Sequence, residues 1–540
     1  MSANEHETAV ETEEISDADN RIAIKALILL LITFILGTLC LQGFNLVFEQ
    51  VGKAVGSPAQ ASLITALPSI VLGIVCFLYG SLGDFVSLKK LVATGLVIVF
   101  IGSIFGFVAN FFFQANLWTV IIARVLQTAG EQVAGSAYLV ITTKYLRSSL
   151  KVIFFGIYTA GYQLSSAIGV FAGGLLSSIH WQFLFLIPAV TILFVPALMK
   201  YLPAMHSTGK GVDWLGFTIF GAACAFVTLF FSYMDWWMLA VSVLLFCLFA
   251  VYIHRNSDND KSPNAAQAAA AQGSTKTESA GESEVKSAAT FDKSAAKPVN
   301  PVKPVAKSAK SRPSFWPAEP FVTPAFFHNT RWLKAIMLIL LFYFTNYSAA
   351  PILNAIGSGV YGMQTIQVSH YIVWAYVVAA IVGTSSGAIV DRIGHTVAII
   401  AAAILMICGF VGASLLVNAG FIWLTLMACI FYAGMGLLYS PVVDTVLGTL
   451  PKEQSGRGVG MNDLVMAITA SIGIAIFGGI MNSQSFAGFS LTGAHGVAAN
   501  CANILLLGAG IIAIGLIVFL LIRKDVYHPA EAEAEAKAKA

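Results

Sequence analysis

Four polar side chains recur at helical spacing within one largely apolar stretch of the chain: Arg124, Gln127, Glu131 and Tyr138. Intervals of three, four and seven residues place them on one face of a helix. Arg124 and Glu131 lie about 10.5 Å apart along that helix, so their charges meet only through extended side chains or through a bridging water or Gln127. Burial disfavours the charged form of a carboxyl group, which makes Glu131 a candidate for binding and releasing protons.

Two further acidic residues, Asp444 and Asp463, stand in apolar stretches of the second half of the chain. Asp444 lies about 12 Å along a helix from Lys452, so it is nearer the end of its stretch than Glu131 is. Charge in hydrocarbon is costly, and each such residue therefore suggests a function. Glu131, Asp444 and Arg124 are the proton-coupling candidates. For the two acids, a structural ion pair or a hydrogen-bonded carboxylic acid is the alternative.

The composition of the chain indicates a hydrocarbon surrounding. Of its 540 residues, 57% are hydrophobic and only 11% are charged, and the mean hydropathy is +0.81. Roughly a quarter of the residues in a soluble domain carry charge. A surface so poor in polar side chains must face a lipid bilayer. The formal net charge of +3 is too small to indicate a nucleic-acid partner.

Runs of about 20 apolar residues can cross a bilayer as helices. About fourteen runs are expected, near residues 23–45, 60–82, 91–112, 116–140, 152–177, 181–200, 214–232, 236–253, 333–353, 366–388, 396–417, 421–447, 460–481 and 501–522. The connecting segments test this assignment, because Lys and Arg collect on the cytoplasmic side. With both termini in the cytoplasm, the outer loops receive only Lys53. We therefore expect a multi-pass protein of the plasma membrane.

Composition also divides the chain into segments. Residues 255–330 are rich in Ala, Ser, Lys, Pro and Glu and hold few apolar anchors, which predicts a disordered cytoplasmic linker. A regulatory docking segment is the alternative. The expected segments are an acidic tail (1–22), six predicted transmembrane helices (23–200), two more (212–254), the linker (255–330), a last set of six (331–524) and a cytoplasmic tail (525–540).

Two short loops on the predicted cytoplasmic side are alike. The first holds Gly80, Asp84 and Lys89, and the second holds Gly387, Asp391, Arg392 and Gly394. In each loop an acidic residue follows a glycine by four positions, where a helix leaves the membrane. A carboxylate there can cap the N-terminus of a neighbouring helix. Two copies at equivalent places indicate an internal repeat, which is typical of transporters built from related halves.

Three sequence patterns carry a family resemblance. Gly80, Leu82, Gly83, Asp84 and Lys89 match a loop pattern G-x-L-a-D-r-x-G-r-k, Arg124 and Gln127 match R-x-x-Q-G of a fourth helix, and Gly156, Gly169, Gly173 and Gly174 match G-x8-G-x3-G-P-x2-G-G of a fifth. On these matches the chain resembles the major facilitator superfamily, specifically its fourteen-helix drug:proton antiporter branch and the tetracycline exporters within it. Thr128, Ser165 and Val170 depart from these patterns.

The resemblance implies an all-α fold of two six-helix bundles that rock around a central cavity, which opens alternately to each side. The loops and the fifth-helix glycines would act in the conformational switch. The proton gradient would supply the energy, with no cofactor and no metal. Where the tetracycline exporters carry three intramembrane carboxylates, this chain has uncharged residues at or near the same places: Gln42, Ser166 and Ala470.

Helices that line the cavity in this family supply the candidate substrate contacts. The candidates are Gln42, Asn45, Gln127, Tyr138, Tyr158, Tyr162, Gln163, Tyr343, Asn346, Tyr347 and Asn354. Aromatic walls with a few polar groups suit amphipathic, drug-like molecules. For each residue taken alone, interhelical packing is the alternative role.

These observations predict a secondary active transporter, acting as a monomer, that exports an amphipathic drug or metabolite in exchange for protons. Proton symport or facilitated movement of a small nutrient is one alternative. A non-transporting membrane sensor that uses the linker is another. An intramembrane enzyme needs converging His, Asp, Ser or metal ligands. The histidines between residues 180 and 495 instead fall in loops or at the ends of the predicted helices, and no HExxH motif is present.

Overall fold

The computed structural model describes residues 17–82, 87–203, 213–257, 322, 327–450, 455–488, 490–491 and 493–527. Every regular element in these ranges is helical, in agreement with the all-α prediction. Asp84 of the first loop, most of the predicted linker and the outer parts of both tails lie outside the described residues.

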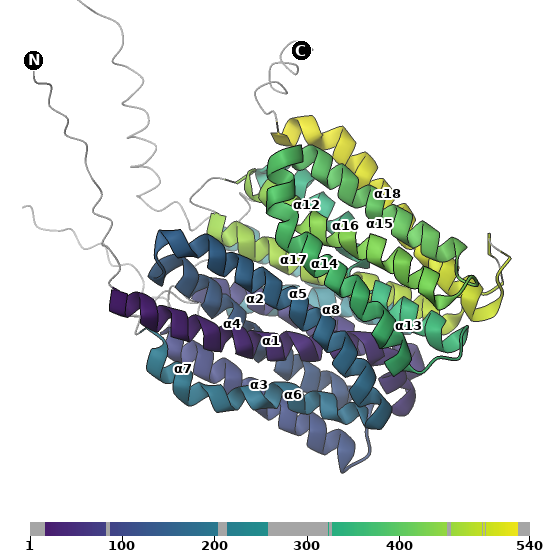
Figure 1. The fold of residues 1–540 in the computed structure, drawn as a ribbon, viewed down its shortest axis with the longest axis horizontal. Helices are drawn as coiled ribbons and strands as arrows, with labels where there is room; N and C mark the ends of the chain where they lie inside the picture. The colour runs from purple at the N-terminus through teal and green to yellow at the C-terminus, as the bar shows by residue number, and fades with distance from the viewer. Residues whose placement is uncertain are drawn as a thin grey trace, which may run out of the picture.

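The N-terminal bundle is drawn purple to blue in Figure 1. It comprises α1 (Asp17–Ala54), the short η1 (Pro58–Gln60), α2 (Leu63–Leu82), α3 (Leu88–Phe111), α4 (Leu117–Tyr145), α5 (Ser148–Ile179) and an irregular last span of η2 (Trp181–Phe185), α6 (Leu186–Ala189), η3 (Val190–Phe194) and α7 (Val195–Tyr201). Pro188 and Pro196 lie in that last span, and proline lacks the N–H that a regular helix needs.

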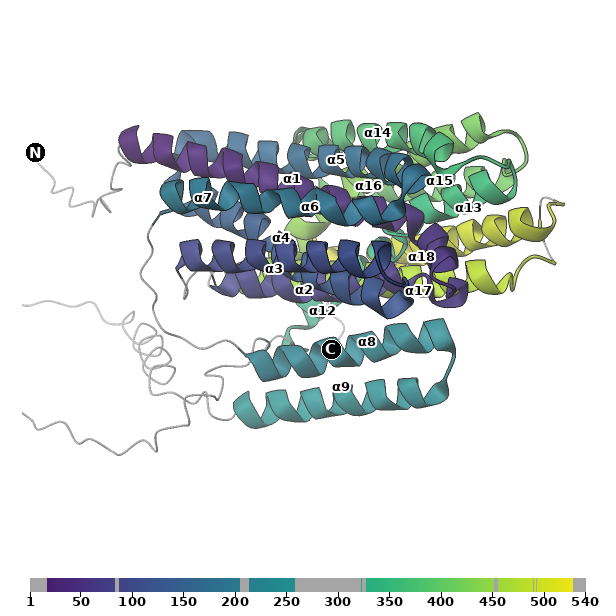
Figure 2. The same ribbon diagram turned by 90° about the horizontal axis from the view of Figure 1, so that it is seen from below.

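Two helices, α8 (Trp214–Tyr233) and α9 (Trp236–Ser257), pack against each other at the side of the bundles (Figure 2). Asp213 begins the pair: its Oδ1 accepts the N–H of Gly216 at 2.8 Å and the hydroxyl of Tyr252 at 2.5 Å. α8 contacts both α2 and α17, so the pair touches one helix of each bundle.

The C-terminal bundle is drawn green to yellow in Figure 1. It comprises α12 (Thr330–Phe342), η6 (Tyr343–Thr345), α13 (Ala349–Gly359), α14 (Thr365–Ile393), α15 (His395–Leu415), α16 (Phe421–Leu447), α17 (Ser455–Ser483) and α18 (Gly496–Tyr527). The predicted run 333–353 is thus a broken helix. Pro351 falls in the first turn of α13, where a missing N–H costs no hydrogen bond.

Every predicted run coincides with a helix or with a broken helix. Thirteen stretches of the described chain are long and apolar enough to cross a bilayer. The remaining run is α4, whose 29 residues extend about 44 Å but carry the polar groups of the Arg124–Tyr138 face. Helices α1, α2 and α3 pack around it. Large apolar side chains lie on the outside instead, with Leu193 73% and Leu521 76% exposed, as a lipid-facing surface requires.

The two bundles meet along two seams, α5 with α14 and α2 with α17. The end of the helices that carries Asp17 and Tyr527 is called the terminal face below (Figure 1), and the opposite end, with Ala54 and Gly359, is called the far face. The loops that contain Lys89 and Gly394 both lie on the terminal face, because α2 and α14 run toward it.

Candidate functional site

A cavity of about 610 Å³ lies between the two bundles. Helices α1, α2, α4 and α5 form one side of it, and η6, α14, α16 and α17 form the other. Seven tyrosines line it: Tyr158, Tyr162, Tyr343, Tyr347, Tyr376, Tyr432 and Tyr439. We call the residues that line the cavity its wall. Among the residues that the structure describes, the wall contains two acidic side chains, Asp444 and Asp463, and no Lys, Arg or His. Its size and the aromatic side chains in its lining are those of a small-molecule site.

The cavity reaches the terminal face. Gly156 near the start of α5 and Gly387 near the end of α14 both line it, and neither has another group within 4 Å of where a Cβ would stand. The side chain of Asp444, at the end of α16, is 67% exposed. The terminal-face ends of the two bundles are therefore apart in this conformation.

Close packing of α1, α5 and α14 shuts the cavity from the far face. A Cβ added to Gly174 of α5 would lie only 2.2 Å from Oγ of Ser369 on α14. Across the same region, Nδ2 of Asn354 donates to the backbone oxygen of Leu46 at 3.2 Å, and Oγ1 of Thr365 donates to Gln50 Oε1 at 3.2 Å. Small residues and hydrogen bonds to neighbouring helices form this seal.

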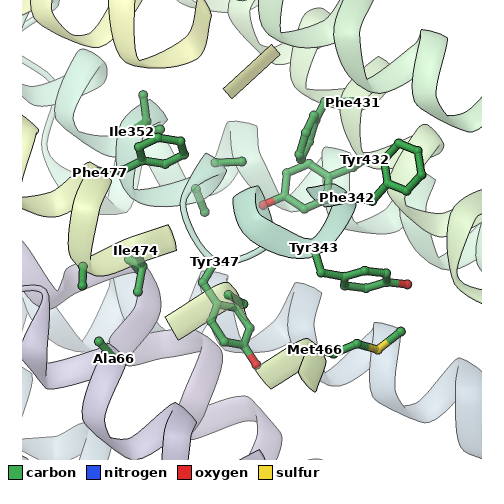
Figure 3. Packing of buried hydrophobic residues seen from close by; sticks show 14 of the residues in the cluster. Ala66, Phe342, Tyr343, Tyr347, Ile352, Phe431, Tyr432, Met466, Ile474 and Phe477 are labelled. Carbon is green, nitrogen blue, oxygen red and sulfur yellow. The ribbon is translucent and has the colours of Figure 1, made fainter. Parts of the chain in front are cut away.

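Aromatic side chains from both bundles form the wall. In the N-terminal bundle the ring of Phe34 stacks on that of Tyr158, with centroids 4.8 Å apart. In the C-terminal bundle the hydroxyl of Tyr432 donates to that of Tyr376 at 3.0 Å. Figure 3 shows Tyr343, Tyr347 and Met466 on one side of the broken helix, with Ile352 and Phe477 packed on the other.

Behind the wall, inside the N-terminal bundle, Arg124 of α4 is fully buried. Its Nη1 donates to Gln127 Oε1 at 3.0 Å, and its guanidinium carbon lies 4.7 Å from the ring centroid of Phe44. Nε2 of Gln127 donates to Ser103 Oγ at 2.9 Å. Nε and Nη2 of Arg124 have no hydrogen-bond partner among the described residues. Its positive charge is therefore compensated only partly by direct contacts.

Glu131 lies two helical turns from Arg124 on the same helix and is 6% exposed. Its Oε2 has no hydrogen-bond partner in the described part of the chain. A Cβ added to Gly37 of α1 would meet Glu131 Cβ at 2.8 Å, so this glycine makes room for the side chain. The next residue, Gln132, lines the cavity. Gln127 contacts Arg124, and no described contact joins it to Glu131.

The sequence matches the family model described as Major Facilitator Superfamily over residues 29–213 and 212–474. The chain belongs to this superfamily. It is a membrane transporter rather than an enzyme.

Solved structures of other transporters share the fold. The nucleoside transporter NupG superposes with a TM-score of 0.55 at 10% identity, covering 93% of this chain and 99% of that chain. A POT family transporter in complex with 5-aminolevulinic acid gives 0.57 at 12% identity, covering 93% and 96%. A D-xylose–proton symporter gives 0.55 at 12% identity, covering 90% and 97%. At these identities the likeness concerns the major facilitator fold alone.

The structure divides the candidate substrate contacts of this facilitator into two groups. Those in the cavity wall are Gln42, Tyr158, Tyr162, Gln163, Tyr343, Asn346 and Tyr347. Asn45, Gln127, Tyr138 and Asn354 are outside the wall and bond within the protein instead. For example, the hydroxyl of Tyr138 donates to the backbone oxygen of Phe154 at 2.8 Å. Their placement agrees with the packing role that was the alternative.

The fifth-helix glycines act at different depths. Gly156 borders the open end of the cavity. A Cβ on Gly169 would lie 2.5 Å from the backbone oxygen of Leu39, and one on Gly173 would lie 2.8 Å from Cα of Gly43, so these two let α5 approach α1. Gly174 forms the seal against α14. Close helix packing therefore accounts for Gly169, Gly173 and Gly174 of the fifth-helix pattern. It does not require the proline of that pattern, in whose place this chain has Val170.

The second loop turns differently from the expectation. Asp391 does not cap α15: the N-cap position is Gly394, which makes no side-chain hydrogen bond. Gly394 has a φ of 80°, a conformation that glycine adopts readily, and one residue therefore joins α14 to α15. Asp391 and Arg392 are exposed at the end of α14. At the start of α3, Ser87 likewise makes no side-chain cap.

Asp444 has a partner that sequence reasoning did not find. Its Oδ2 lies 2.6 Å from Nε2 of His395, the first residue of α15. The contact joins α16 to the second loop at the mouth of the cavity. In this conformation Asp444 therefore has the structural pairing that was the alternative to proton exchange.

Several wall residues were also missed, among them Phe34, Cys76, Tyr376, Tyr432, Tyr439 and Met466. Tyr432 and Tyr439 stand seven residues apart on α16, with Gly436 and Val443 continuing the same face. That spacing is visible in the sequence. It carries little weight there, because the helix is apolar on every side and aromatic residues pack in many such helices.

The sequence of α14 contains one motif that is typical of enzymes. Residues 383–387 read G-T-S-S-G, which fits the G-x-S-x-G spacing of a hydrolase nucleophile elbow. The stretch lies inside the continuous helix α14 instead of at a turn from strand to helix. Its serines therefore lack the strained backbone that presents a catalytic hydroxyl.

Proposed function

We propose that this transporter is a proton-coupled exporter of an amphipathic, drug-like compound or metabolite. It works by alternating access in the plasma membrane, with both termini in the cytoplasm. The terminal face carries the two repeated loops and their basic residues, so its open cavity is the cytoplasmic entrance. The substrate enters there and leaves on the far face once the α1–α5–α14 seal opens.

Glu131 is the observation that supports proton coupling. Its carboxyl group is almost fully buried, and one of its oxygens is unpartnered within the described protein. A charged carboxylate in this position costs much more free energy than a protonated one. A change in hydration as the bundles rock therefore changes its affinity for a proton. Gln132 places the adjacent part of α4 in the cavity wall, where substrate and proton can influence each other.

The test is the direction of proton movement in proteoliposomes of known orientation that contain a pH-sensitive dye. Molecules inserted with their terminal face outward move substrate into the lumen. When substrate is added outside, the lumen should become more alkaline, because protons leave as substrate enters. A lumen that becomes more acidic identifies symport and contradicts the proposal. Liposomes without protein control for substrate that crosses the bilayer unaided.

Proton symport or facilitated movement of a small nutrient is the second candidate. It is favoured by α5, which runs unbroken from Ser148 to Ile179 with buried Val170 at the place of the antiporter proline. In the dye experiment, symport gives the opposite pH change, and facilitation gives substrate movement with no pH change.

A further inference from the structure

We infer that an anionic phospholipid binds at the terminal-face end of the N-terminal bundle, with its headgroup held by Lys25 of α1 and Lys200 of α7. This inference goes beyond the proposed function, because it concerns the lipid around the transporter and not the substrate in its cavity. Three observations support it. The two lysines share one aromatic ring, no described acidic side chain balances them, and apolar side chains continue from both into the hydrocarbon.

The two lysines meet at the ring of Tyr201. Nζ of Lys25 lies 5.5 Å from the centroid of this ring, and Nζ of Lys200 lies 5.6 Å from it. Tyr201 itself packs against the hydrophobic cluster of the N-terminal bundle, where α7 lies beside α1 (Figure 2). The packing of one ring therefore gathers two positive charges at one place on the terminal face.

The described protein does not balance these two charges. Both lysines are exposed, and no ion pair joins either of them to a described acidic side chain. An aromatic ring attracts a cation through the negative charge of its face, but it has no net charge and cannot neutralise the cation. Two like charges at one place repel each other, and an anion beside them removes that cost. The site therefore favours an anionic ligand.

The corresponding end of the C-terminal bundle has a different arrangement. There too the first helix, α12, contacts the last helix, α18. Lys334 of α12 forms an ion pair with the carboxylate of Asp525 on α18. Arg331 donates to the backbone oxygens of Asp525 and Val526, each at 3.1 Å. The protein itself thus binds the positive groups of α12, whereas Lys25 of α1 lies near a second lysine.

Apolar side chains lead from both lysines into the bilayer. On α1, exposed Ile28 and Ile32 follow Lys25 by three and seven residues, so they lie on the same helix face about 4.5 and 10.5 Å deeper. On the last span of the bundle, exposed Leu193 precedes Lys200 by seven residues. Lysine at the end of a lipid-facing helix extends its ammonium group to the level of the headgroups. A phosphate there can contact both lysines while its acyl chains lie along these apolar side chains, which favours a phospholipid over a free phosphate ion.

Native mass spectrometry of the full-length protein in detergent tests the inference by counting bound lipid molecules during a titration. The probes are phosphatidylglycerol and phosphatidylcholine with identical acyl chains, of which only the first has a net negative charge. We expect phosphatidylglycerol to bind more tightly. The full-length chain is used so that its acidic tail (residues 1–22) competes with the lipid for the lysines.

The variants remove or keep the two positive charges. Each lysine near an anionic surface contributes about a factor of five to the affinity, so Lys25→Gln combined with Lys200→Gln should weaken phosphatidylglycerol binding about 10-fold to 30-fold. Lys25→Arg combined with Lys200→Arg should retain most of the binding. The matched control combines Arg523→Gln with Lys524→Gln, which removes two exposed positive charges from the end of α18. This control should bind the lipid as the parent does.

Equal binding of the two lipids, or undiminished phosphatidylglycerol binding by the double glutamine variant, overturns the inference. An equal loss of binding in the α18 control does so too, because any basic residue of the terminal face would then serve. Displacement of the lipid by glycerol phosphate at the same concentration would identify a site for a free phosphate group and also overturns it. Unfolding of the double glutamine variant is detected by its melting temperature. The single variants Lys25→Gln and Lys200→Gln then decide the result, each with an expected loss of about fivefold.

Discussion

The two bundles of this transporter carry their charged side chains at different depths. In the N-terminal bundle, Arg124 and Glu131 lie inside the helix packing, behind the cavity wall. In the C-terminal bundle, Asp444 and Asp463 belong to the wall itself. In our proposal the two bundles therefore have two tasks. The N-terminal bundle holds Glu131, which binds and releases the coupled proton, and the C-terminal bundle supplies the acidic side chains that face the substrate.

The largest effect should come from removing the Glu131 carboxyl group in the N-terminal bundle. With one proton exchanged for one substrate molecule, each pH unit contributes a factor of about ten to the substrate gradient. Glu131→Gln should abolish this gradient and leave downhill exchange. Accumulation of substrate in vesicles under an imposed pH gradient measures it. Glu49→Gln, which removes a half-buried acid of α1 that is outside the wall, is the matched control. Equal accumulation by the parent and Glu131→Gln would disprove this role.

The next effect concerns the contact between the bundles. Gly174→Ala places a methyl group against Ser369, whereas Gly156→Ala on the same helix meets open space. Both changes gain the same helix propensity, so their difference isolates the clash. We expect Gly174→Ala to destabilise this sealed conformation by about 1–3 kcal/mol relative to Gly156→Ala. The readouts are melting temperature and modification of the cavity residue Cys76 by a polar thiol reagent, located by mass spectrometry. Identical behaviour of the two variants would contradict the described seal.

A moderate effect is expected at the wall of the C-terminal bundle. Tyr439→Leu removes an aromatic face and should raise the half-saturating substrate concentration about twofold to twelvefold, as expected for an aromatic contact of about 0.5–1.5 kcal/mol. The number of protons moved per substrate should stay the same. Transport at several substrate concentrations, with the pH change recorded in parallel, separates the two quantities. A changed proton ratio would mean that the tasks are not divided between the bundles.

The smallest effect is expected for the exposed pair at the mouth. Asp444→Asn weakens the contact with His395, and an exposed contact of this kind contributes no more than about 0.2–1 kcal/mol. The melting temperature should fall slightly, and uphill accumulation should fall less than in Glu131→Gln. A loss of accumulation as large as that of Glu131→Gln would make Asp444 a coupling residue and remove the contrast between the bundles.

Sequence patterns predicted the fold well because lipid imposes long apolar runs, and each predicted run coincides with helical structure. They also placed Arg124 and Gln127 on one helix face, where the two side chains are in contact. They did not find His395 beside Asp444, since 49 residues separate the pair and only the packing of α15 on α16 joins them.

The cavity wall was predicted in part. Tyr343 and Tyr347 follow a break in the helix, and the polar residues near them made the region conspicuous in the sequence. Tyr376 and Tyr432 stand in α14 and α16, where the side of each helix that faces the cavity is set by its neighbouring helices. Asn354 lies outside the wall for the same reason, because its hydrogen-bond partner, the backbone oxygen of Leu46, belongs to the other bundle.

The position of α8 has a consequence for how the molecule moves. This helix rests on α2 and α17 together, so it spans the line where the two halves join on that side. Sliding or separation there would break the packing contacts of α8 with one or both of these helices. On the opposite side α5 and α14 have no such bridge among the described helices, and their terminal-face ends already stand apart. The rotation axis should therefore run near α2 and α17, with the widest displacement at α5 and α14.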